Sequence, residues 1–220
     1  MVGQACLLAE IRRDLPRMPS ERYRMGKVTA QVSDSVCYQG EWYALAGVRP
    51  RRGALFDPSQ YDLRVRPITT ACWRGYVCTY EVDDDRLELV SVDLGVSDPP
   101  TELFGAPVSQ GSFGSARYEP IRVPQPFDGG LLIASEFLPD LYVHMGFHQA
   151  WKYRHVLELI FADGHLTEAH DRSLDAVARR AAEGVLPRRP WWRRWGSDDP
   201  RRLGDRVDPS FHRDYRPGSG

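Results

Sequence analysis

The chain has 220 residues, of which 42% are hydrophobic and 27% charged. This composition excludes a wholly disordered chain and suits one folded domain with flanking segments. The formal net charge is only -1, so no global basic field favours nucleic acid as the partner.

The chain opens with an apolar pattern over residues 5–15 that has helical spacing and stops at Pro16. We predict a short helix or an ordered arm within residues 1–24. From Lys27 the period changes to two, and Tyr38-Gln39-Gly40 has the composition of a turn. Residues 27–48 are therefore predicted to form antiparallel strands with short connections.

The clearest hairpin follows. Residues 72–82 are rich in aromatic and β-branched side chains, three aspartates over 83–85 supply the turn, and residues 86–94 return as a strand. Prolines and glycines then interrupt residues 97–126. Such a stretch is either a long functional loop or a flexible insertion.

The last third of the chain predicts two further strands and a helix. Residues 129–137 form a buried apolar run, and the alternation over 153–161 ends at Asp163-Gly164, a hairpin signal. Residues 141–151 fit a strand, a turn or a short helix. Ser173 is predicted to cap a helix over 174–183 that Gly184 ends.

Together these elements predict an α+β fold. It is mainly an antiparallel sheet of meander-like hairpins with a C-terminal helix and a disordered tail. We expect three parts: an N-terminal helix or arm over 1–24, a single globular domain over 25–187, and a flexible Arg/Trp-rich tail over 188–220.

Histidines provide one candidate site. His144, His148 and His155 lie within twelve residues, with Glu158 close behind. A His-x3-His pair on a helix can bind a metal, and a histidine can act as a general base. No zincin pattern accompanies them, however, and the alternative is a loop histidine beside a satisfied sheet histidine. We therefore expect no metal site and no cofactor.

The second candidate lies in the hairpin at residues 72–78. On a regular strand Cys72, Arg74, Tyr76 and Cys78 share one face, which suits an anion, a carboxylate or a planar ligand. A cysteine beside an arginine can also have a lowered pKa. The alternative is a core strand in which Arg74 pairs with a carboxylate. Residues 111–115, Gly-Ser-Phe-Gly-Ser, resemble a flexible loop without a phosphate-binding or nucleophile-elbow pattern.

The tail provides the third candidate. It holds nine Arg and five Asp, a net charge of +4, which leaves -5 for residues 1–187. Aromatic residues interleaved with arginines can anchor on a protein, including their own domain, or bind nucleic acid or a membrane surface. The predicted contact residues are Trp191, Trp192, Arg193, Arg194 and Trp195.

The four cysteines form no C-x-x-C pair, the chain shows no secretory signal, and no run of about 18 residues is apolar. We therefore expect a cytoplasmic protein with free thiols. The favoured function is a non-catalytic protein-binding accessory, adaptor or immunity-type factor of a bacterial system. The alternatives are a ligand- or metal-binding domain or enzyme using the histidines with Arg74, Tyr76 and Glu158, and a tail that binds nucleic acid or membranes.

Overall fold

A computed structural model describes residues 30–52, 55–143 and 146–184 of the chain. The predicted N-terminal arm, His144 and the Arg/Trp-rich tail lie outside these residues. The predicted domain limits at 25 and 187 therefore stay predictions.

The described residues form a mostly β structure with one α-helix. The longer strands are β1 (Ser35–Tyr38), β2 (Glu41–Arg52), β3 (Tyr76–Asp83), β4 (Arg86–Leu94), β9 (Asp128–Phe137), β10 (Tyr153–Ala162) and β11 (His165–Asp171). The shorter strands are β5 (Glu102–Leu103), β6 (Ala106–Gln110), β7 (Ala116–Tyr118) and β8 (Val123–Pro124). The helix is α1 (Ser173–Ala182), and short 3₁₀ turns lie at Pro58–Tyr61, Ser112–Gly114, Pro139–Leu141 and Ala150–Lys152.

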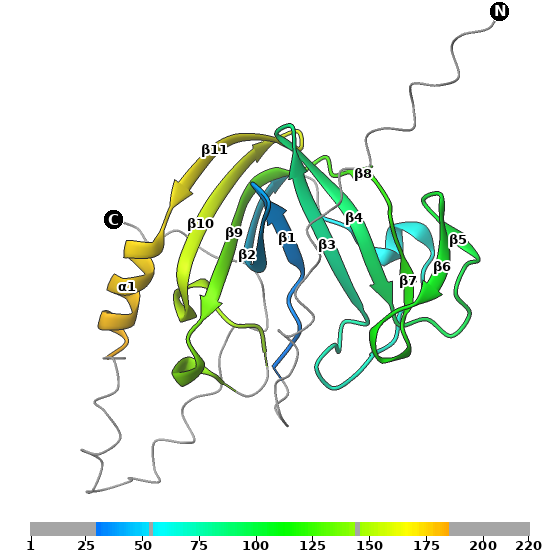
Figure 1. Ribbon diagram of the computed structural model, residues 1–220, viewed down its shortest axis with the longest axis horizontal. Helices are drawn as coiled ribbons and strands as arrows, with labels where there is room; N and C mark the ends of the chain where they lie inside the picture. Colours follow the sequence, from blue (N-terminus) through cyan, green and yellow to red (C-terminus); the bar gives the residue numbers. More distant parts are fainter. Residues whose placement is uncertain (1–29, 53–54, 144–145, 185–220) are drawn as a thin grey trace, which may run out of the picture.

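The seven longer strands close into a barrel (Figure 1). Their order is β11-β10-β9-β2-β1-β3-β4, and a pairing of His165 with Arg86 joins β11 back to β4. The strands β7, β6 and β5 extend outward from β4 on one side, and α1 lies on the opposite side beside β10. The loops and the helix are thus all attached to one closed barrel.

Alternating apolar side chains fill the barrel interior. Leu87, Leu89, Val92 and Leu94 of β4 are all buried in the same core cluster, although four residues with this spacing cannot share one face of a regular strand. The register of β4 against β3 shifts between Leu89 and Ser91, which makes Val90 the extra residue of a β-bulge. The bulge keeps both pairs pointing inward, and a barrel of this strand number is filled by such side chains.

The predicted class is confirmed in its main features: the structure is dominated by strands, mostly antiparallel, and has a C-terminal helix. The meander-like arrangement is wrong as a full description. β1 pairs with β3 in parallel, with Ser35 opposite Thr79, and the sheet closes on itself. Hairpin signals report only neighbours along the chain, so neither of these long-range pairings leaves a local trace.

Most predicted elements occur close to their expected positions. The strand expected over 72–82 begins only at Tyr76, because Gly75 has a φ of 81° and turns the chain. A Cβ on Gly75 would lie 2.5 Å from the carbonyl oxygen of Arg66, so the turn is also too crowded for a side chain. The irregular stretch 97–126 contains the short strands β5 to β8.

The helix α1 starts differently from the prediction. Ser173 is its first residue, not its cap, and the Ser173 hydroxyl accepts a hydrogen bond from the Val156 N–H at 3.2 Å. The Asp171 carboxylate instead accepts from the Ser173 N–H at 2.8 Å. Hydrogen bonding to the Ser173 side chain, and second to its N–H, lowers the pKa of Asp171. No helix among the described residues is both long and apolar enough to cross a membrane.

Closure of the barrel depends on the turn between β10 and β11. Gly164 has a φ of 74°, accepts a hydrogen bond from Leu87 N–H at 2.9 Å, and donates to the carbonyl oxygen of Phe127 at 3.0 Å. A Cβ at this position would lie 2.3 Å from the carbonyl oxygen of Gln125. Glycine is therefore required both by the backbone angle and by the close approach of two chain segments.

We expect Gly164→Ala to destabilise the protein more than Gly40→Ala. Gly40 has a similar φ of 79° but open space around its Cβ position, so its substitution costs only about 1–2 kcal/mol of left-handed strain. Gly164→Ala adds a backbone clash of about 1–3 kcal/mol. Urea unfolding of both variants measures the difference, and equal losses would show that the close approach at Gly164 is not required.

Candidate functional site

The structure places Arg74 in a buried ion pair. Its Nη1 donates to Asp34 Oδ2 at 3.1 Å, and its Nη2 donates to Asp34 Oδ1. Its Cζ lies 4.5 Å from the centre of the Tyr76 ring. Asp34 is 1% exposed and also accepts from the Cys78 N–H at 2.7 Å. Burial lowers the pKa of Arg74, but pairing with Asp34 outweighs it, and the pKa is raised.

Arg74 and Tyr76 therefore lie together, as the sequence predicted, but a carboxylate of the same chain occupies the position expected for an anion. The expectation of a lowered Cys72 pKa is wrong. Burial raises the pKa of the Cys72 thiol, and the opposing effect of Arg74 is smaller. This group fixes the segment before β1 to the start of β3.

The predicted histidine group is divided among separate sets of contacts. The His148 ring packs 4.4 Å from the Phe137 ring, and the exposed His155 contacts Glu136 at 3.3 Å. Glu158 is buried and accepts from Arg172 Nε at 2.9 Å and Nη2 at 2.7 Å.

Two surface hollows, of about 600 and 350 Å³, lie at the end of the barrel where β11 meets β4. None of the predicted ligand-binding residues lines them. They are lined by Arg52, Arg86, Leu87, Pro124, Gln125, Pro126, Asp128, Asp163, Gly164 and His165. Within the described ranges, no group of three or more His, Cys, Asp or Glu side chains is arranged to hold a metal ion.

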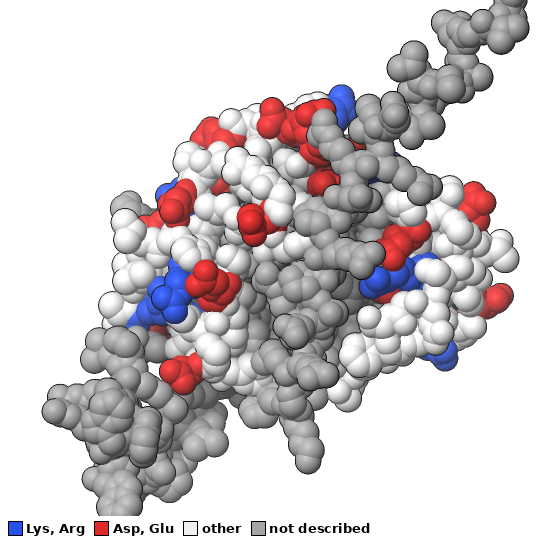
Figure 2. Space-filling view, in the orientation of Figure 1, with Lys and Arg blue, Asp and Glu red and all other residues white. Residues whose placement is uncertain are grey.

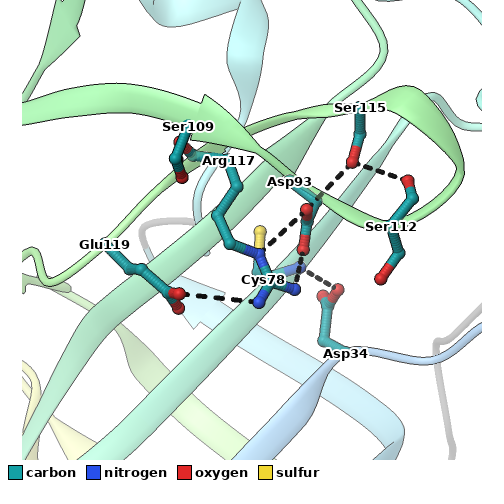
Figure 3. Close-up of polar contacts among 8 residues, drawn as sticks. All are labelled: Asp34, Cys78, Asp93, Ser109, Ser112, Ser115, Arg117 and Glu119. Carbon is teal, nitrogen blue, oxygen red and sulfur yellow. Dashed lines mark hydrogen bonds and ion pairs between the residues drawn. The ribbon is translucent and has the colours of Figure 1, made fainter.

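A better-defined constellation lies on the opposite side of the barrel from α1, at the loop between β6 and β7 (Figure 3). Asp93 of β4 is nearly buried and accepts hydrogen bonds from Arg117 of β7, at 3.1 Å from Nε and 2.7 Å from Nη2. The Ser115 hydroxyl lies 2.9 Å from Asp93 Oδ1 and 2.8 Å from the carbonyl oxygen of Ser112. The loop is thereby fastened to the barrel wall.

The loop backbone is closed by its own hydrogen bonds. Gly111 N–H donates to the carbonyl oxygen of Ser115 at 2.8 Å, and Ser115 N–H donates to Ser112 at 3.2 Å. A Cβ on Gly111 would lie 2.0 Å from Asp93 Oδ1. Gly111 therefore allows the chain to pass directly over the carboxylate. We call residues 109–117 the Phe113 loop.

Phe113 stands at the tip of this loop with two unfavourable features. Its side chain is 73% exposed, and its φ of 56° lies in the left-handed region that bulky residues avoid. Phe104 has a similar φ of 53°, but its ring packs 4.9 Å from Tyr61 and 6.2 Å from Phe56. Packing compensates the strain at Phe104, whereas the exposed Phe113 ring lacks such compensation in the part of the chain that the structure describes.

The chemistry of the Asp93 group is that of a fixed support. Hydrogen bonds to Asp93 raise the pKa of Arg117, so its guanidinium stays charged and continues to donate. Ser115 is buried and faces a carboxylate already engaged by an arginine, an arrangement that holds the hydroxyl as a donor. The group therefore fastens the chain next to Phe113, at Ser112 and Ser115, to the barrel, as in a preorganised contact loop.

The sequence prediction missed the Phe113 loop. Residues 111–115 were interpreted as a flexible loop, because the supporting Asp93 lies 22 positions from Ser115 in the chain. The sequence feature that could have indicated this loop is Phe113, an aromatic residue between Gly111 and Gly114. Comparison with protein-family models, curated proteins and solved structures gives no match to this chain. Its function must therefore be inferred from its own residues.

We expect Asp93→Ala to loosen the Phe113 loop. The change removes the carboxylate that accepts from Ser115 and Arg117, and leaves the Ser115 hydroxyl only the Ser112 carbonyl oxygen. We expect a cost of about 1–3 kcal/mol of unfolding free energy. Amide hydrogen exchange at Gly111 and Ser115 should accelerate. Glu119→Gln is the control, because Glu119 contacts Arg117 only at 3.6 Å and is half exposed. If loop exchange is as slow in Asp93→Ala as in the control, Asp93 is not the support.

Asp34→Ala tests the buried pair at the start of β3. Removing the carboxylate leaves the Arg74 charge buried without its partner, and we expect a loss of about 3–5 kcal/mol in chemical denaturation. The double variant Asp34→Ala/Arg74→Met removes both charges and should recover most of this loss. No recovery would mean that the Cys78 N–H bond to Asp34, not the ion pair, carries the stabilisation.

Proposed function

We propose that this protein is a non-catalytic protein-binding factor and that the Phe113 loop is its contact element. The single observation that carries the proposal is an exposed aromatic residue held in a strained backbone conformation by a buried polar support. Strained residues that their surroundings hold in place are typical of functional positions. Aromatic anchors at preorganised positions dominate binding energy in protein interfaces.

The surroundings of Phe113 fit a partner with an apolar pocket and a polar rim. Val108 on β6 is exposed, and the nearby residues Ser109, Gln110 and Ser112 are exposed and carry uncharged polar side chains. An apolar centre with a polar border is the usual composition of a non-obligate interface. We propose such a partner protein, in place of a small molecule, for this surface.

The predicted cytoplasmic location forms part of the proposal. Cys37, Cys72 and Cys78 are all free thiols, as expected for a protein of a reducing compartment. The space-filling view shows acidic side chains gathered along the upper rim of the barrel and mixed charges lower down (Figure 2). This distribution supports a protein partner more than a polyanion.

Phe113→Asn separates binding from stability. Asparagine tolerates the left-handed region and is polar, so we expect the variant to be as stable as the native protein or up to about 1 kcal/mol more stable. Binding should fall at least tenfold, since a central aromatic anchor contributes about 2 kcal/mol or more. Affinity capture from the native host with quantitative mass spectrometry, followed by titration of the captured partner, measures both.

The control is Trp73→Ala, which removes another exposed aromatic side chain, 63% exposed, from a different loop. A partner that is retained by this control and lost by Phe113→Asn supports the proposal. Equal capture of every protein by native chain and Phe113→Asn would overturn it. A marked loss of stability in Phe113→Asn would assign the phenylalanine a packing role instead.

A further inference from the structure

The helix α1 places its apolar side chains away from the barrel. Leu174, Val177, Ala178 and Ala181 have the i, i+3, i+4, i+7 spacing of an apolar helix stripe, which normally faces a core. Here all four are exposed, with Leu174 at 82% and Val177 at 51%. We call these four residues the α1 stripe.

The helix reaches the barrel through a different face. Ala176 is buried with Ala134, Tyr153 and Val156, and Arg180 donates to the carbonyl oxygens of Trp151 at 2.6 Å and Tyr153 at 2.8 Å. The helix is thus anchored without using its stripe. An apolar stripe left uncovered on a fixed helix indicates a surface that another segment covers.

We infer that the Arg/Trp-rich tail of the same chain covers the α1 stripe, with Trp191, Trp192 and Trp195 as its apolar contacts. The inference rests on the exposed stripe, on the way the helix ends, and on the sequence that follows it. It is independent of the Phe113 loop, which lies on the opposite side of the barrel in Figure 1.

The helix ends at a residue that turns the chain off the helix axis. Gly184 has a φ of 67°, and its N–H donates to the carbonyl oxygen of Ala181 at 3.1 Å. A left-handed glycine at this position turns the chain off the helix axis and often brings following apolar residues against the last turns. A turn of this kind is compatible with following residues that pack along α1.

The length of the connection is sufficient. Seven residues lead from Gly184 to Trp191 and span at most about 23 Å when extended. The ten residues from Leu174 to Gly184 cover only about 15 Å of helix. The three tryptophans can therefore reach every position of the stripe. So short a tether also gives the tail an effective concentration in the millimolar range, which favours it over a second copy.

Charge favours the same occupant. The tail has a net charge of +4 against -5 for the rest of the chain. Asp171 ends β11 and Asp175 lies in the first turn of α1, where it is 71% exposed with a 3.5 Å contact to Arg172. Arg172 itself is held by Glu158. Arginines 188, 189, 193 and 194 can supply the complementary charges.

The test uses the full chain and observes the six tryptophan indole N–H signals by ¹⁵N NMR. Single Trp→Phe substitutions assign the signals of Trp191, Trp192 and Trp195. We expect at least two of the three to lie away from random-coil positions and to show contacts to Leu174 and Val177 methyl groups. The double variant Leu174→Ser/Val177→Ser should move them to random-coil positions without unfolding the barrel, because both side chains are exposed.

Val108→Ser, another exposed apolar position, is the matched control and should leave the three signals unchanged. Random-coil positions in the native chain, or positions insensitive to the double variant, would overturn the inference. So would signals that shift only as protein concentration rises, because a second copy would then be the occupant. None of these results bears on the Phe113 loop, so the two proposals fail separately.

Discussion

The closure of the sheet at the β10–β11 turn is the constraint on which the rest of the structure depends. At Gly164 three chain segments meet: β4 through Leu87, the segment before β9 through Phe127, and the turn itself. Without this closure the start of β4 and the start of β11 would be unpaired, whereas the rest of β4 pairs with β7 and β8. Once it is closed, the interior is filled by side chains, and the barrel wall becomes a fixed frame for its loops.

Buried carboxylates attach the irregular segments to this frame. Among the described residues, Asp34, Asp93 and Glu158 are buried, and each pairs with an arginine: Arg74, Arg117 and Arg172, respectively. Each arrangement links a strand to a turn, a loop or the approach to α1. The planar guanidinium suits this use, because two hydrogen bonds from one guanidinium fix orientation as well as distance. Arginine, which suggested an anion-binding site in the sequence, thus forms ion pairs within the chain.

The sequence predicted what depends on neighbours along the chain. The hairpin at Asp83 to Asp85, the turn at Asp163-Gly164 and the helix before Gly184 all follow from local patterns of glycine, aspartate and alternating apolar residues. The parallel pairing of β1 with β3 was not predictable in this way, since it joins residues more than forty positions apart. The Asp93 support was missed for the same reason. The sequence offered pairing of Arg74 with a carboxylate as an alternative but could not identify Asp34, which lies forty positions away.

Exposure alone does not distinguish Phe113 from the other exposed aromatic residues. Tyr61 is 41% exposed, but its ring stacks on Phe56 at 5.5 Å and meets Phe104 edge-on, so its position is explained by packing. Trp73 is exposed in a turn with no left-handed φ of its own. Phe113 combines exposure, a left-handed φ and a dedicated support of Asp93, Ser115 and Arg117.

A support of this kind stabilises the loop without requiring a phenylalanine at its tip, because its hydrogen bonds come from Gly111, Ser112, Ser115 and Arg117. Any residue suited to the left-handed region would complete the loop at lower cost. The Phe113 ring is 73% exposed and so adds little to the packing of the described chain, whereas the proposed partner would receive it. The backbone strain at Phe113 is therefore the reason to propose the contact surface at this residue, and not at exposed aromatic residues that the fold itself explains.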